Sequence, residues 1–233
     1  MPNPRSEADF VKQTIVTAIV LSALCAAFAR GAGGATSAAK RLGGATFVVD
    51  PGHGTRFPDG SPLNVGAVGP SGIEENKVTL AVAEDLAALL RAAGATVVLT
   101  RSYAKPYRTA TDKRRDNRSR ATLANALHAT AFVAVHADSS LSRDARGTSV
   151  FWLRPNSVTL ANAVRARLAP LGLGESAFRA RDLAVTNEAR VPAVLVELGY
   201  VSNPVQEHLL ATPVFQKRQA QALFDAIADT FAR

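Results

Sequence analysis

Two of the four histidines in this 233-residue chain stand at the end of an apolar run. His53 lies in FVVDPGHGTRFPDG, where Pro51, Gly52 and Gly54 would let the backbone turn tightly, and His136 follows AFVAV without a break. Two neutral imidazoles and one carboxylate form a common ligand set for catalytic zinc, whose fourth position stays open for water. Each histidine taken alone is more often a structural residue. The zinc interpretation therefore depends on carboxylates at the same place.

Three glutamates qualify as partners for these histidines. Glu197 follows the apolar run AVLV directly, and Glu74 and Glu75 lie in the first turn of a helical segment. Zinc lowers the pKa of bound water towards neutrality, and a further carboxylate must then carry the proton to the leaving group. Two histidines and two glutamates would fill these four roles. The residues alone do not choose between Glu74 and Glu75, which could instead complement the helix macrodipole.

Other catalytic classes find less support in the sequence. It contains neither a G-x-S-x-G nucleophile motif nor a phosphate-binding P-loop. The only cysteine, Cys25, lies in an N-terminal apolar run, so removal of that run would also remove any cysteine nucleophile. We expect structural roles for His128, which follows an apolar helix, and for His208, which lies in a surface helix with the sequence QEHLL.

The elements that must position these side chains alternate between strands and helices. Apolar runs predict strands at Ala45–Val49, Thr96–Thr100, Ala131–Val135, Ser149–Leu153 and Ala193–Val196. Helical spacing of apolar residues predicts helices at Glu75–Ala93, Ser119–His128, Val158–Leu168 and Pro213–Ala232. This alternation predicts one three-layer α/β domain with a mostly parallel or mixed sheet between helices. Ligands of such sheets bind at the carboxyl ends of strands, where the candidate residues stand.

The N-terminal part of the chain predicts export. Residues 1–29 begin with positive charges, continue through the apolar run TIVTAIVLSALCAAFA and end in A-x-A, which is typical of a signal peptide. We expect cleavage near Ala29, with a retained membrane anchor as the alternative, and a location in the periplasm or cell envelope. Residues 30–44 are rich in glycine and alanine and indicate a linker. The catalytic domain would then occupy residues 45–233.

The chain is strongly basic, with a net charge of +8 and an isoelectric point near 10.2. Residues 101–120 hold eight Lys or Arg and two Asp, a net charge of +6, which indicates a solvated basic loop leading into a helix. No nucleic-acid-binding motif accompanies this charge, so we expect no nucleic-acid partner. The charge suits other negatively charged partners, such as an anionic lipid or an anionic wall polymer.

Four motifs, in order, resemble those of the zinc-dependent N-acetylmuramoyl-L-alanine amidases of bacterial cell-wall turnover. They are VVDPGHG (Val48–Gly54), GIEENKVTLAVAEDL (Gly72–Leu86), RATLANALHATAFVAVHAD (Arg120–Asp138) and VPAVLVELGYVSNPVQEHLL (Val191–Leu210). The resemblance covers nearly everything from Ala45 to the C-terminus. It implies a mixed sheet of about six strands. It also implies hydrolysis of the amide between the lactyl group of N-acetylmuramic acid and L-alanine of the stem peptide.

Carried over to this sequence, the resemblance implies that His53, Glu75 and His136 bind Zn²⁺. It implies that Glu197 is the catalytic acid/base. The family pattern selects Glu75 over Glu74, because it places the ligand three residues after Gly72.

Three further residues are candidates for supporting roles. Arg181 and Asn76 are candidates to hold the peptide or to stabilise the oxyanion. Asp50 is a candidate to orient a ligand histidine. The expected partner is peptidoglycan or a muropeptide. We expect contact with a membrane only through the N-terminal segment, if it is not cleaved. We also expect a monomer.

The sequence departs from the family pattern in two loops. Residues 55–64 widen the loop after His53 and are a candidate wall of the substrate groove, and residues 104–117 are longer and more basic than usual. The short connection after His136 leaves no room for the inhibitory helix of some division-associated amidases. A zinc peptidase acting on stem peptides and a non-catalytic wall-binding module remain as alternatives.

Overall fold

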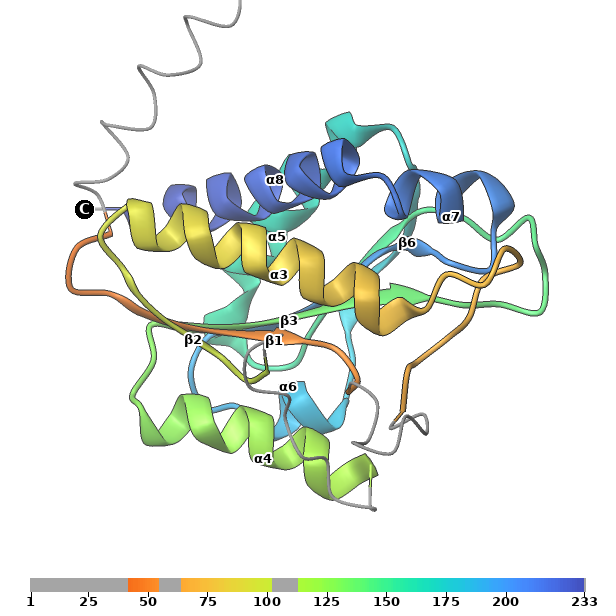
Figure 1. The fold of residues 1–233 in the computed structure, drawn as a ribbon. Coiled ribbons are helices and arrows are strands. Elements are labelled where there is room, and N and C mark those ends of the chain that lie inside the picture. The colour runs from red at the N-terminus through yellow and green to blue at the C-terminus, as the bar shows by residue number, and fades with distance from the viewer. Residues whose placement is uncertain (1–41, 55–63, 102–112, 233) are drawn as a thin grey trace, which may run out of the picture.

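The computed structural model describes residues 42–54, 64–101 and 113–232 (Figure 1). Within these residues the chain forms a six-stranded sheet in the order β2-β1-β3-β6-β4-β5. The strands are β1 (Thr46–Pro51), β2 (Thr96–Leu99), β3 (Ala131–Asp138), β4 (Thr148–Trp152), β5 (Glu175–Ala180) and β6 (Ala193–Tyr200). The prediction of one α/β domain with a mixed sheet of about six strands is confirmed.

The centre of the sheet is parallel and buried. Strand β1 pairs in parallel with β2 and β3, and β3 pairs in parallel with β6. Strands β1, β3 and β6 are almost wholly buried, which explains why each reads as a continuous apolar run. These three central strands are the ones that reach the candidate residues.

The far edge of the sheet differs from the simple parallel pattern. Strand β4 runs antiparallel to β6 and parallel to β5, which makes the sheet mixed. The sequence ESAFRA of β5 did not predict a strand, because its residues are exposed or only half-buried and leave no apolar run. An edge strand with one free side tolerates such a sequence.

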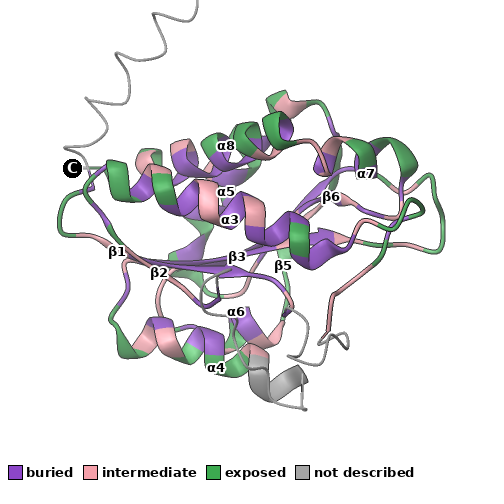
Figure 2. Ribbon diagram, in the orientation of Figure 1, coloured by how far each residue is buried: buried purple, intermediate pink, exposed green. Residues whose placement is uncertain are grey.

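Helices cover both faces of the sheet (Figure 1). One face carries α3 (Glu75–Ala92), α5 (Val158–Leu168) and α8 (Pro213–Phe231), and the other carries α4 (Lys113–Ala126) and the short α6 (Ala184–Glu188). A short helix, α7 (Pro204–Leu210), follows β6. Figure 2 shows the buried sides of these helices turned towards the sheet. Two apolar clusters, one on each face, form the core.

One helix boundary differs from its sequence prediction, and one loop agrees with its prediction. Helix α4 begins at Lys113, six residues before the predicted start at Ser119, because Lys and Arg are good helix formers even without an apolar stripe. Residues 139–147 between β3 and β4 contain no helix, as expected from the short connection.

Several predictions concern residues outside the described part of the chain. The signal peptide of residues 1–29, nearly all of the linker and the groove wall at 55–63 fall there, as does the basic stretch 102–112. Among the residues that the structure describes, no helix combines the length and the apolar character needed to cross a membrane.

Candidate metal centre and active site

His53, Glu75 and His136 meet at the carboxyl edge of the sheet. Each offers one ligand atom, and these atoms all lie within 4.8 Å of one another. Glu75 Oε2 is 3.0 Å from His53 Nε2, and Glu75 Oε1 is 3.1 Å from His136 Nδ1. Donors about 2.1 Å from a tetrahedral zinc ion lie about 3.4 Å from each other. The donor types and their spacing therefore fit a zinc ion.

Three elements bring these residues together. His53 lies in the turn after β1, His136 is the sixth residue of β3, and Glu75 is the first residue of α3. His136 and Glu197 therefore lie inside their strands and not just beyond them, since the ladder continues through the pair His136–Glu197. Glu74 faces elsewhere and pairs with Lys77 at 3.3 Å.

Two glycines allow the ligand side chains to approach the backbone closely. A Cβ atom at Gly52 would lie 2.5–2.6 Å from three atoms of the His136 ring. A Cβ atom at Gly66 would collide with Glu75 and with the His53 ring. Gly52 was expected to relax the turn, but the left-handed conformation falls on His53 itself, at a φ of 65°. The requirement for glycine at position 52 is one of space.

The carboxylate of Glu75 is held at both oxygens. The backbone N–H of Ala67 donates to Oε2 at 2.9 Å, and that of Ala137 donates to Oε1 at 3.0 Å. Burial raises the Glu75 pKa, but the hydrogen bonds with His136 and His53 more than offset it, so this pKa lies well below its usual range. Glu75 is therefore anionic at neutral pH, as a metal ligand must be.

The loop before α3 is fixed by a buried carboxylate from another helix. Glu207 of α7 is 2% exposed and accepts hydrogen bonds from the backbone N–H groups of Ser71 and Ile73. This contact joins two segments that flank the site. One is the loop before α3, the helix that begins with Glu75, and the other is α7, which follows the strand that contains Glu197. Glu207 lies in the fourth motif, but nothing in its local sequence indicated this contact.

Glu197, on β6, lies beside this candidate metal-binding cluster. It pairs in register with His136 on one side and with Ser149 on the other. Burial raises the pKa of Glu197 well above its usual value, the negative charges of Glu75 and Asp138 raise it further, and Arg181 lowers it in part. Its buried Oε2 has no hydrogen-bond partner among the described residues. A carboxyl group with a raised pKa and a free oxygen is suited to act as a general acid/base.

The two candidate substrate-binding residues have different surroundings. Arg181 is exposed, its guanidinium lies 5.0 Å from the centre of the Phe151 ring, and its charge acts on Glu197. Asn76 is 5% exposed, and its Nδ2 donates to the Gly54 carbonyl at 2.6 Å. Arg181 thus stands at the rim of the site, whereas the amide N–H₂ group of Asn76 holds the turn that carries His53.

Asp50 supports the site through other partners than the expected imidazole. Its buried carboxylate accepts hydrogen bonds from Thr100 and from Arg120. The Nδ1 atom of His53 instead lies 3.1 Å from Asn64 Oδ1. Sequence reasoning missed Asn64, because no local pattern indicates which loop residue meets a histidine eleven positions earlier.

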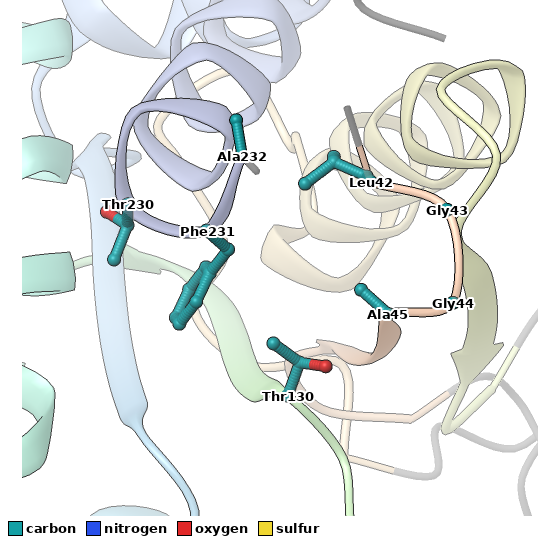
Figure 3. A pocket seen from close by; sticks show the side chains of 8 residues that line it. All are labelled: Leu42, Gly43, Gly44, Ala45, Thr130, Thr230, Phe231 and Ala232. Carbon is teal, nitrogen blue, oxygen red and sulfur yellow. The ribbon is translucent and has the colours of Figure 1, made fainter. Parts of the chain in front are cut away.

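The opposite end of the sheet contains a pocket without ionisable side chains. This pocket, of about 370 Å³, lies at the amino ends of β1 and β3 (Figure 3). Its lining consists of Leu42, Gly43, Gly44, Ala45, Thr130, Thr230, Phe231 and Ala232. Its lining has no carboxylate or imidazole for hydrolytic chemistry, so the carboxyl edge with its His–Glu–His cluster is the candidate active site. His128, exposed just after α4, and His208, exposed on α7, do not join that cluster.

The fold and the site define a class of protein: three-layer α/β domains with a His–Glu–His cluster that could hold a metal ion and a carboxyl group beside it. The chain belongs to the N-acetylmuramoyl-L-alanine amidase family (Amidase_3), whose profile matches residues 47–229. This match includes all four residues of the candidate centre.

Individual relatives agree with the family. "Probable cell wall amidase LytH" of Staphylococcus saprophyticus is 32% identical over 195 residues, which make up 83% of this chain and 61% of that protein. The chain thus spans about three fifths of the length of such curated relatives.

Solved structures give the same result. The catalytic domain of the amidase CwlV from Bacillus (Paenibacillus) polymyxa superposes with a TM-score of 0.69 and 34% identity, covering 79% of this chain and 97% of that domain. The amidase Ami1 from Mycobacterium smegmatis gives a TM-score of 0.71 and 26% identity, covering 82% and 98%.

Proposed function

We propose that this protein hydrolyses the amide bond between the lactyl group of N-acetylmuramic acid and L-alanine of the stem peptide in peptidoglycan. The observation that carries the proposal is the convergence of His53, Glu75 and His136 beside Glu197 in a member of this family. A module that only binds the cell wall would have no need for a complete ligand set next to a buried acid/base group.

The three ligands would hold Zn²⁺, which when bound polarises the scissile carbonyl and lowers the pKa of a water molecule. The carboxylate of Glu75 neutralises one of the two positive charges, and the two glycines keep the imidazoles close to it. Glu197 would accept the proton of the attacking water and pass it to the leaving amine of L-alanine. Its free, buried Oε2 is the atom that we assign to this transfer.

Substrate would approach along the exposed rim of the site. Arg181 is an exposed cation at this rim, and we assign it the role of binding the anionic groups of the stem peptide. The net charge of +8 would favour association with the anionic cell wall, an effect that weakens as salt is added. We further propose that the protein works outside the cytoplasm as a monomer. N-terminal sequencing of the exported protein and its molar mass in solution test these two points.

Release of a covalently attached dye from labelled sacculi tests the activity. The zinc-loaded protein should release the dye, a chelator should stop the release, and added zinc should restore it. Glu197→Gln should keep near-stoichiometric zinc and lose release. Chelator-resistant release, or full release by Glu197→Gln, would contradict the proposed mechanism.

A further inference from the structure

The turn that carries His53 has an unfavourable backbone conformation. His53 has a φ of 65°, in the left-handed region that non-glycine residues rarely occupy. Such a conformation persists only where the surrounding structure fixes it. Hydrogen bonds to the carbonyls of this turn can provide such fixation.

Two buried arginines bind three consecutive carbonyl groups of the turn. Arg101 donates to the carbonyls of Pro51, at 3.0 Å, and Gly52, at 2.6 Å. Arg120 donates to those of Pro51, at 3.1 Å, and His53, at 2.9 Å. Arg101 is 2% exposed and Arg120 is 1% exposed. Arg101 thus spans two neighbouring carbonyls, and Arg120 spans two carbonyls on either side of Gly52.

The charge of Arg120 is balanced by the strand that leads into the turn. Its Nη1 lies 3.0 Å from Asp50 Oδ1, and both side chains are 1% exposed. Thr100 donates to the same carboxylate oxygen. Buried charges are tolerated when they are paired and hydrogen-bonded in this way. Asp50 therefore fixes the guanidinium that in turn fixes the carbonyl of His53.

Arg101 connects the turn to the helix that carries the second ligand. Its Nη2 also donates to the Asn76 carbonyl at 3.0 Å and to Thr79 Oγ1 at 3.2 Å. Asn76 follows Glu75 directly in the first turn of α3. One guanidinium therefore sets the His53 turn and the Glu75 helix at a defined separation.

We propose that Arg101 and Arg120 are positioning residues of the metal centre, which hold the His53 turn in its left-handed conformation and align it with Glu75. The inference rests on the proposed function, because it takes His53 and Glu75 as metal ligands. It also changes the interpretation of the basic segment 101–120, whose two terminal arginines are buried and not solvated. A lysine cannot replace either residue, because one ammonium lacks the planar fork that reaches several carbonyls at fixed spacing.

The test compares Arg120→Lys and Arg101→Lys with Arg118→Lys as the matched control. Arg118 lies on the same helix as Arg120, is 54% exposed and pairs at the surface with Glu188. All three changes keep the charge. Zinc affinity by competition with a chromophoric chelator and the visible spectrum of the cobalt-loaded protein report the ligand geometry. Hydrogen–deuterium exchange over residues 51–54 of the metal-free protein reports the turn itself.

We expect zinc affinity to fall about 10- to 100-fold in Arg120→Lys and Arg101→Lys, the range seen when groups that orient metal ligands are changed. Their cobalt spectra should change, and the Gly54 amide, which donates to the Asn64 carbonyl, should exchange faster. Arg118→Lys should match the wild type in all three measurements.

Wild-type zinc affinity together with wild-type exchange in both buried variants would overturn the inference. A wild-type protein that fails to bind zinc would refute the proposed function instead, and exchange in the metal-free proteins would then decide this inference alone. If circular dichroism shows that Arg120→Lys does not fold, Arg101→Lys provides the same comparison with the pair Asp50–Arg120 intact.

Discussion

A single methyl group added at Gly52 should disable the metal centre while leaving the fold in place. In Gly52→Ala the new Cβ atom would lie 2.5 Å from the nearest atom of the His136 ring, whereas ordinary contacts begin near 3.4 Å. The ring would have to move by about 0.9 Å. The backbone of residue 52 cannot yield easily, because its N–H donates to Val135 and its carbonyl accepts from Arg101 and Thr79.

That displacement is several times the tolerance of about 0.2 Å in metal–ligand distances. Loss of orientation alone weakens metal binding about 10- to 100-fold, and displacement of a ligand should weaken it by at least about 100-fold. Competition with a chromophoric chelator measures the affinity, and dye release from sacculi should fall in parallel. Circular dichroism of the metal-free variant should match that of the wild type.

Gly43→Ala is the matched control, because a Cβ atom there has nothing within 4 Å and the backbone is not left-handed. It should bind zinc and release dye as the wild type does. If Gly52→Ala bound zinc with wild-type affinity, the reasoning from space at the His136 ring would be refuted.

Three further predictions follow from the same site. Glu197→Gln should lower kcat by about 10²- to 10⁴-fold, the usual range for a general acid/base, with zinc affinity kept in a titration. In the metal-free protein the same change should raise the free energy of unfolding at neutral pH. The pKa of Glu197 is higher in the folded protein than in the unfolded chain. Between these two pKa values only the unfolded chain is ionised, so the free energy of unfolding of the wild type falls as pH rises, by up to about 1.4 kcal/mol per pH unit. Urea unfolding at several pH values should show the difference growing from about pH 4 upward, and a constant difference would count against a buried, protonated Glu197. Free zinc at about 1,000 times its dissociation constant should stabilise the protein by about 4 kcal/mol, seen as a rise in Tm that His136→Ala abolishes.

The central sheet could be predicted from the sequence, because strands that are buried on both faces consist of consecutive apolar residues. Strands β1, β3 and β6 are buried on both faces, so each is a short unbroken apolar run. Because these strands are parallel neighbours, polar residues near their carboxyl ends meet at one edge. The sequence pattern alone therefore predicts that His53, His136 and Glu197 lie together.

What the sequence did not reveal depends on contacts between distant segments. The edge strand β5 has no apolar run, because it is half-exposed. Asn64 meets His53 only because the intervening loop closes. Arg101 and Arg120 were interpreted as part of a solvated basic segment, since a sequence shows charge but not burial. Gly52 was predicted to ease a turn, whereas it makes room for a ring carried by another strand.

The identity of the bond that is cleaved tests the central claim most directly. Sacculi should be digested by the zinc-loaded protein in water enriched in ¹⁸O, and the products analysed by mass spectrometry. The account predicts free stem peptides that begin with L-alanine, together with glycan whose lactyl carboxylate carries one ¹⁸O atom. Shortened stem peptides that remain attached to the sugar, with ¹⁸O in a peptide carboxylate, would contradict it and would identify a peptidase instead.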